Sequence, residues 1–274
     1  MMVQSHLFWK IDQMYTYDTH AHLDHLEHLE SALDNARQSG VAAIVAVSMN
    51  LESCQNSLKI KKRFTNPKIY LGMGMHPAEA SLVALDQCIQ FTREQRNELA
   101  VIGEIGLDFW YKWVRKDQDK KAEQRKVFRA FLELAHEFDL PAVVHSRGVW
   151  RECLETLKDF KIKKAEFHWY SGPVDVLKDI LDEGYYISTT PSLAYSPQLR
   201  EAVEYAPIQQ TMIETDCPVY FNNTNTGVGF KAEPKDVFKT LEAYCEIKKV
   251  NRDFAVIQFN QNAQNFFGIK VEEI

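Results

Sequence analysis

The sequence contains no apolar segment long enough to cross a lipid bilayer. Its longest wholly apolar run covers only the seven residues 41–47, whereas a transmembrane helix needs roughly 18 or more. The first residues also lack a basic start followed by an apolar stretch and a small-residue cleavage site. We therefore expect neither a membrane span nor a secretory signal, and nothing in the composition indicates an obligatory protein partner.

Cysteine is scarce, and its spacing indicates no disulfide framework. The five cysteines stand at positions 54, 88, 153, 217 and 245. Their number is odd, they are widely spaced, and no CxxC pair occurs. This pattern predicts free thiols in a reducing, cytoplasmic setting.

An excess of basic residues is also missing. The chain has 32 Lys plus Arg against 38 Asp plus Glu, a formal net charge of −6. A protein that coats nucleic acid through a uniformly basic surface has the opposite balance, so this class is excluded. A local basic cleft remains compatible with the count.

No Pro/Gly-rich linker or break in composition divides the chain. Short β-branched or apolar runs alternate with longer amphipathic ones at intervals of about 28 residues, which a strand, a helix and two short loops require. We expect strands at 15–18, 41–47, 69–74, 100–104, 141–145, 164–168, 185–188 and 211–215. Eight such units favour a single (β/α)8 TIM barrel, with an open doubly wound sheet as the alternative.

Two helices and one loop have clear signatures. In 119–139 apolar residues recur every three or four positions and charges fill the other face, which predicts an amphipathic helix. The expected first helix carries its apolar stripe at Leu26, Leu29, Leu33 and Ala36. Residues 217–233 are rich in Asn, Thr and Gly and are expected to form a loop, either a lid over a site or a surface loop.

Imidazoles and carboxylates gather at the expected strand ends, where chemistry collects in barrels of this kind. The six are His20, His22, Glu104, His145, His168 and Asp216. Taken singly, a strand-end histidine is commonly exposed or hydrogen bonded, and a carboxylate often caps the next helix. Six donors at one mouth exceed the four that a tetrahedral zinc needs and suit two adjacent divalent ions.

Seven segments follow one another along the chain in a distinctive order. They are DTHAHLD (18–24), GMGMHP (72–77), GEIGLDF (103–109), EQRKVFRAFLELAHEFDLPAVVHSR (123–147), FHWYSG (167–172), ETDCP (214–218) and NFFG (265–268). In this order they resemble the TatD family of metal-dependent hydrolases, a barrel branch of the amidohydrolase-like enzymes. The resemblance covers nearly the whole chain, and although HxH alone is common among barrel hydrolases, the ordered set is highly specific.

The resemblance implies a two-metal phosphoesterase, usually described as a deoxyribonuclease. It assigns His20, His22 and Asp216 to one ion, His145 and His168 to the other, and Glu104 to a bridge between them. The expected ions are Mg²⁺, Mn²⁺ or Zn²⁺. Two such cations, about 3.5–4 Å apart, can lower the pKa of a bound water and neutralise charge on phosphodiester oxygens.

The resemblance also implies roles for individual residues. Glu104 and Asp216 would be catalytic, with Asp216 accepting a proton from the attacking water. His76 and Arg147 fall at family positions associated with substrate, here a DNA end or a nucleotide-type phosphodiester. The alternatives are a turn after the third strand for His76 and a salt bridge at the rim for Arg147.

The same resemblance predicts where the barrel domain begins. Similar proteins tend to begin near Met14, so we expect residues 1–14 to be an N-terminal extension and 15–274 the barrel domain.

The segments 148–150 and 217–220 differ from the common family pattern. Hydrolysis of a small amide, ester or lactone therefore stays open, as does a catalytically silent metal- or nucleic-acid-binding module. Glu104, where lactonase-like barrels carry a lysine, favours the TatD-like interpretation.

One further segment bears on the substrate. Residues 108–121 interleave four aromatic side chains with five bases and three acids, a local charge of +2 in an acidic chain. Aromatic faces can stack on nucleobases while cations follow the phosphates. Packing of the same aromatic residues between helix and barrel is the alternative.

Overall fold

The computed structural model describes residues 15–223 and 226–269. The expected N-terminal extension, residues 1–14, lies outside the described residues. Within them, no helix is both long and apolar enough to cross a membrane. The five cysteines all lie in the described part of the chain and are free thiols, as expected.

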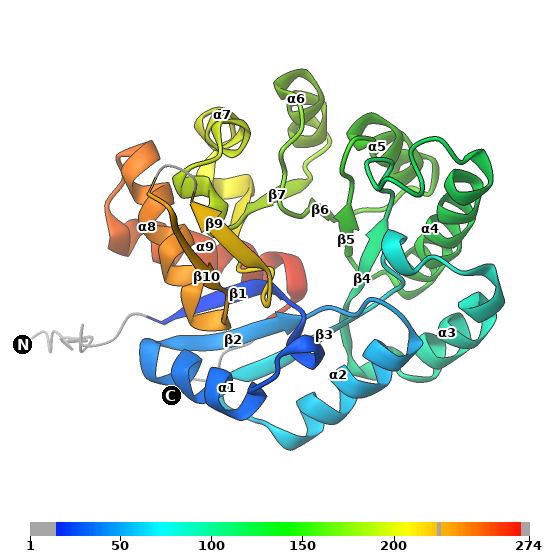
Figure 1. Ribbon diagram of the computed structural model, residues 1–274, viewed down its shortest axis with the longest axis horizontal. Coiled ribbons are helices and arrows are strands. Elements are labelled where there is room, and N and C mark those ends of the chain that lie inside the picture. The colour runs from blue at the N-terminus through cyan, green and yellow to red at the C-terminus, as the bar shows by residue number, and fades with distance from the viewer. Residues whose placement is uncertain (1–14, 224–225, 270–274) are drawn as a thin grey trace, which may run out of the picture.

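Eight parallel strands form one sheet in which each strand pairs with its neighbours in sequence order (Figure 1). They are β1 (Thr16–Ala21), β2 (Val41–Ala46), β3 (Lys68–Met73), β4 (Leu99–Gly106), β5 (Ala142–His145), β6 (Ala165–Phe167), β7 (Tyr186–Thr189) and β8 (Thr211–Ile213). A parallel bridge between Ala21 and Cys217 joins the end of β1 to the segment after β8. The sheet thus curls into a nearly closed (β/α)8 barrel, which confirms the predicted fold over the open sheet.

Helices follow the strands and surround the barrel (Figure 1). They are α1 (Leu29–Ser39), α2 (Leu51–Arg63), α3 (Leu82–Glu94), α4 (Gln118–Phe138), α5 (Trp150–Asp159), α6 (Val174–Asp182), α7 (Pro197–Tyr205), α8 (Val237–Lys248) and α9 (Arg252–Phe267). In α4, the apolar stripe from Val127 to Phe138 is buried as predicted. The carboxylate of Asp117 caps this helix by accepting from the backbone N–H groups of Asp119 and Lys120 at 3.0 Å.

Helix α9 seals the amino-terminal end of the barrel. The side-chain amide of Asn262 donates to the backbone carbonyls of Ile208 and Thr211, where the chain enters β8. Phe266 and Phe267 pack with the inward-facing apolar side chains of the strands. Apolar side chains thus fill this end of the barrel, and in barrels of this kind the chemistry gathers at the carboxyl ends of the strands.

Three local predictions differ from the structure. Helix α1 begins at Leu29, so Leu26 precedes it, in extended backbone at the end of a short turn. Strand β1 runs on to Ala21, past its predicted end at residue 18. Residues 217–233 are not an irregular loop, since they contain the antiparallel strands β9 (Tyr220–Asn223) and β10 (Val228–Lys231).

The hairpin forms because of the residues in the two flanks of segment 217–233. Its Asn and Gly residues cluster toward the turn of the hairpin, whereas aromatic side chains occupy the strands. The rings of Phe221 and Phe230 lie 5.7 Å apart across the pair, and Phe221 also contacts Trp169 at 5.6 Å. The hairpin is therefore anchored to the loop after β6 by aromatic packing.

Candidate metal centre

The six predicted donors meet at the carboxyl ends of the strands. His20 lies in β1 and His22 directly follows it, and their spacing of two along an extended segment points both rings to the same side. The others come from β4 (Glu104), the end of β5 (His145), the residue after β6 (His168) and the segment after β8 (Asp216). Strands that are far apart in sequence thus contribute to one cluster.

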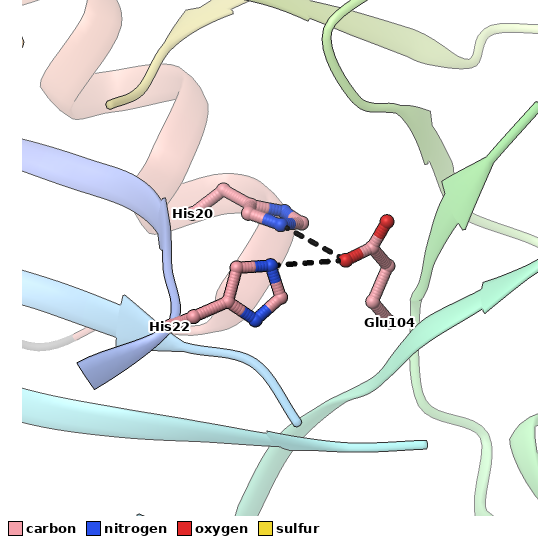
Figure 2. A group of neighbouring side chains, drawn as sticks. All are labelled: His20, His22 and Glu104. Carbon is pink, nitrogen blue, oxygen red and sulfur yellow. Dashed lines mark ion pairs between the residues drawn. The ribbon is translucent and has the colours of Figure 1, made fainter. Parts of the chain in front are cut away.

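Glu104 is the centre of this cluster, and its two carboxylate oxygens face different histidines. Oε2 lies 3.3 Å from Nε2 of both His20 and His22 (Figure 2). Oε1 lies 2.9 Å from Nδ1 of His145 and 2.8 Å from Nε2 of His168. The carboxylate therefore stands between two groups of donors.

Asp216 completes the group on the Oε2 side. Its Oδ1 lies 3.4 Å from Nε2 of His20 and 3.3 Å from Nε2 of His22. Its backbone is held in the left-handed region at φ 51°, where its N–H donates to the carbonyl of His20 at 3.0 Å. Aspartate tolerates this conformation better than most residues, which suits it to the sharp path of the chain after β8.

The donor set fits divalent cations because buried atoms in it lack partners. Among the described residues, Nε2 of His20 and Oε2 of Glu104 are buried without a hydrogen bond of good geometry. Each such group costs about 1–3 kcal/mol when left unsatisfied. Imidazole nitrogens and carboxylate oxygens are ligands shared by zinc and manganese, and carboxylates also suit magnesium. A bound cation would satisfy both atoms at once.

The local charges shift the pKa values of these groups in opposite directions. Burial raises the pKa of the Glu104 carboxyl, but the imidazoles of His168, His76 and His20 outweigh it and hold that pKa well below its usual range. Burial lowers the pKa of His22, but Asp216 and Glu104 raise it to about 10. The centre thus holds the ionised Glu104 carboxylate among imidazoles. The carboxylate attracts these imidazoles when they are protonated, and it can share a metal ion with them when they are neutral.

Two further carboxylates orient the histidines, and sequence reasoning assigned them no role in the site. The Asp108 Oδ2 atom lies 2.8 Å from Nε2 of His145, which leaves Nδ1 of that ring facing Glu104. The feature that could have identified Asp108 from the sequence is its position two residues beyond the end of β4, on the same barrel rim as the proposed ligands.

Glu214 lies behind two of the rings. Its Oε2 is 3.8 Å from Nδ1 of His20, and its Oε1 is 3.5 Å from Nδ1 of His168. Oε1 also accepts the backbone N–H of Trp169 at 3.0 Å. In the sequence, no local pattern distinguishes Glu214 from an ordinary buried acid.

His76 and Arg147, the predicted substrate residues, both line the cavity above the donors. Nδ1 of His76 accepts the N–H of Ala78 at 3.0 Å, so the proton of the neutral ring lies on Nε2. Burial lowers the pKa of His76 to about 3 despite the nearby Glu104. Although Nε2 lies only 3.4 Å from Glu104, a protonated nitrogen cannot ligate a metal, so His76 is a hydrogen-bond donor here.

Arg147 is anchored at one edge of its guanidinium. Nε lies 2.9 Å from Oδ2 of Asp108, and the guanidinium carbon lies 4.9 Å from the centre of the Tyr111 ring. The predicted rim salt bridge is therefore present, yet it uses only Nε. The side chain is about half exposed and lines the cavity.

The cavity has a volume of about 680 Å³ and combines polar and aromatic walls. Its aromatic side chains are Tyr111, Trp150, Trp169 and Tyr195. His25, to which the sequence assigned no function, also lines it, with its ring stacked 5.8 Å from that of His22. A flat, anionic substrate matches such a lining better than an aliphatic one.

Comparison with known proteins agrees with this geometry. The family model described as TatD related DNase matches residues 17–268. The chain is 27% identical over 263 residues to a putative deoxyribonuclease, tatdn3, of Danio rerio, covering 91% of this chain and 96% of the relative. It is 30% identical over 255 residues to an uncharacterized metal-dependent hydrolase of Methanocaldococcus jannaschii, with the same coverage.

Solved structures support the same fold. A TatD homolog from Escherichia coli K12 superposes with a TM-score of 0.83 at 24% identity, covering 93% of this chain and 98% of that one. A TatD family hydrolase from Entamoeba histolytica gives a TM-score of 0.82 at 22% identity, with the same coverage. Together with the family match along nearly its whole length, these likenesses show that the chain belongs to the TatD family of metal-dependent hydrolases.

Proposed function

We propose that this chain is a phosphodiesterase that acts on DNA with two divalent metal ions. The observation that carries the proposal is the position of Glu104, whose two oxygens face two separate donor groups at 2.8–3.3 Å. A carboxylate in this position can bridge two cations. The names of the Danio rerio and human relatives, both described as deoxyribonucleases at 27% and 26% identity, support DNA as the substrate.

We assign the ligands by the oxygen of Glu104 that each one faces. His20, His22 and Asp216 would hold one ion with Oε2, and His145 and His168 would hold the other with Oε1. When bound, Mg²⁺, Mn²⁺ or Zn²⁺ ions supply a more acidic water and neutralise charge on the phosphoryl oxygens. The ions would thus be held by side chains from five strand ends.

The chain's own residues would perform the remaining steps. Burial raises the pKa of the Asp216 carboxyl, but His22, His20 and His168 outweigh it and lower that pKa, so the group is ionised and can accept a proton from water. The terminal amino groups of Arg147 would bind phosphate oxygens, for which a planar cation is suited. Nε2 of His76, which also lines the cavity, would donate to a substrate oxygen.

A screen of metals against substrates tests this function. Protein stripped with EDTA would be assayed with Mg²⁺, Mn²⁺ and Zn²⁺ on single-stranded DNA, bis(p-nitrophenyl) phosphate, a p-nitrophenyl ester, a small amide and a lactone. We expect metal-dependent cleavage of the two phosphodiesters, and its loss in the Glu104→Ala variant. Faster turnover of the ester, amide or lactone would favour the alternative hydrolase. No turnover of any substrate would favour a silent binding module.

Two further proposals concern the chain as a whole. We propose that residues 15–274 form the catalytic domain, with residues 1–14 as an extension outside it. We also propose a cytoplasmic location, supported by five free thiols that are not arranged for disulfide pairing. Fractionation of cells that produce the full-length protein would test the location.

A further inference from the structure

The turn after β4, residues 109–116, separates its aromatic side chains into two sets. Phe109 is partly buried, with the Lys121 ammonium 5.2 Å and the Arg125 guanidinium 4.9 Å from its ring centre. Trp110 and Trp113 are 64% and 57% exposed. Packing against the barrel, one of the two roles considered from the sequence, therefore accounts for Phe109 but not for the tryptophans. We call residues 109–116 the aromatic turn.

Exposed indoles are unusual, because tryptophan is highly buried on average and its burial is strongly favourable. Two of them in a four-residue stretch need a reason. The rest of the aromatic turn is well anchored, since Val114 is buried and the backbone N–H of Trp110 donates to the Asp108 carboxylate at 2.8 Å. The two indoles are thus presented to solvent by a structured segment.

Each indole connects to Arg147 through one other residue. The ring of Trp113 stacks on that of Tyr111 at 4.4 Å and 16°, and the guanidinium of Arg147 lies 4.9 Å from the Tyr111 ring centre. Trp110 packs on Gly148, where a Cβ atom would approach its Cδ1 to 2.1 Å. A continuous aromatic surface therefore leads from the cavity mouth at Arg147 outward to solvent.

The charge of the aromatic turn complements a polyanion. Lys112, Arg115 and Lys116 are exposed, and none of them forms an ion pair within the described residues. They alternate with the indoles in a chain whose net charge is −6. Unpaired cations that alternate with exposed aromatic faces match a strand of phosphates and bases better than they match an apolar protein surface.

We propose that the aromatic turn is a stacking platform for the bases of single-stranded nucleic acid, next to the phosphate held at Arg147. The proposal rests on the proposed function, because it places the platform beside the scissile phosphate. Bases in a duplex already stack on their neighbours, so a free indole face selects unpaired nucleotides. The platform would make the enzyme prefer single-stranded ends over paired DNA.

The test compares binding to normal and abasic strands. A fluorescein-labelled oligothymidylate of about ten nucleotides, and an abasic strand of equal length and charge, would be titrated with full-length protein in EDTA, which prevents hydrolysis. Fluorescence anisotropy gives the Kd. The variants are Trp110→Ala and Trp113→Ala. Tyr205→Ala is the control, because Tyr205 is an exposed aromatic at the end of α7 and does not line the cavity.

We expect Trp110→Ala to raise the Kd for oligothymidylate by roughly 5- to 150-fold, the range for loss of one base–aromatic stack. Its effect on the abasic strand should stay below about twofold, because no base is present to stack. Equal weakening for both strands, or none for either, would overturn the platform. Tyr205→Ala should leave both Kd values unchanged.

Failure of the proposed function would look different. If metal-loaded protein cleaves no phosphodiester but Trp110→Ala still weakens only the base-containing strand, the platform stands and the chain binds nucleic acid without cutting it. If cleavage of bis(p-nitrophenyl) phosphate is normal but the two strands respond alike to Trp110→Ala, the phosphodiesterase stands and the platform is wrong. Circular dichroism of each variant would verify that it is folded.

Discussion

The imidazole rings of His20 and His168 lie parallel, with centroids 4.1 Å apart and planes 8° apart. They come from β1 and from the end of β6, and they belong to different proposed ion sites. Nε2 of each ring faces Glu104 and Nδ1 of each faces Glu214. The two carboxylates therefore flank the pair at opposite edges, next to one proposed ligand of each ion.

Replacing Glu214 with Gln should weaken both ions at once. The amide keeps the size of the side chain but removes the charge that orients Nδ1 of His20 and His168, and loss of such a partner typically lowers metal affinity by about 10- to 100-fold. Isothermal titration calorimetry with Mn²⁺ measures this metal affinity. Glu166→Gln is the matched control, because Glu166 is a buried carboxyl whose pKa burial raises well above its usual range, so an amide resembles its neutral form. Equal losses in the two variants would contradict this role.

Asp216→Asn should lower kcat by about 10²- to 10⁴-fold, the usual contribution of a general base. The amide cannot accept the proton, and it also binds cations less well. Rates should therefore be compared at saturating Mn²⁺, which separates the loss of the base from the loss of a ligand. A rate that returns to the wild-type value at high Mn²⁺ would remove Asp216 from proton transfer.

Metal binding should release protons at neutral pH. In the metal-free protein burial lowers the pKa of His22, yet Asp216 and Glu104 raise it to about 10. A raised folded-state pKa stabilises the metal-free fold fully below about 6.5, the unfolded value, and this contribution is lost as the pH rises through about 10. A cation competes with the same proton, so its affinity should rise with pH across that interval.

Titration calorimetry in two buffers of different ionisation enthalpy would count these protons. The exposed His136 on α4 offers a control, since His136→Asn should leave the count unchanged. An affinity for Mn²⁺ that does not change from about pH 6.5 to 9 would contradict protonation of His22 in the metal-free centre.

Arg147→Lys should raise KM for bis(p-nitrophenyl) phosphate by about tenfold or more, since one charge-assisted hydrogen bond contributes about 1.5–3 kcal/mol. Lysine keeps the charge but loses the planar fork and the stack on Tyr111. The comparison is with Arg151→Lys, an exposed arginine on α5 that pairs with Asp179. If both variants keep the wild-type KM, Arg147 serves only its bond to Asp108.

Deletion of residues 1–13 should leave the barrel intact. The proposed domain begins at residue 15, and β1 starts at Thr16. We expect the melting temperature to change by no more than about 2 °C, which for a domain of this size corresponds to about 1 kcal/mol. A larger loss in a thermal scan would mean that the extension packs on the domain.

The strands and the convergence of the six imidazole and carboxylate side chains could be predicted from the sequence because both obey short-range rules. Buried parallel strands are short apolar runs, and a barrel brings their carboxyl ends together, so His145 and His168 could be placed in one cluster without coordinates. Glu104 could be placed in the same cluster because it lies at the carboxyl end of its strand. These features depend on periodicity and topology, which are visible along one chain.

What the sequence could not predict depends on contacts between distant segments. Glu214 orients His20 and His168 across the barrel, and no local pattern distinguishes it from an ordinary buried acid. The hairpin at 217–233 was missed because its stability comes from Phe221 packing on Trp169. The exposure of Trp110, too, follows from how the aromatic turn is anchored.

The bonds that join β1 to the segment after β8 also bear on the order in which the proposed metal centre can assemble. The N–H of His22 donates to the carbonyl of Cys217 at 2.8 Å, and the N–H of Asp216 donates to the carbonyl of His20 at 3.0 Å. The first donor group therefore needs residues from both ends of the chain. A nascent chain on the ribosome carries His20 and His22 early but lacks Asp216 until most of the barrel has been synthesised. With the proposed ligands, the first ion site can therefore assemble only late in synthesis.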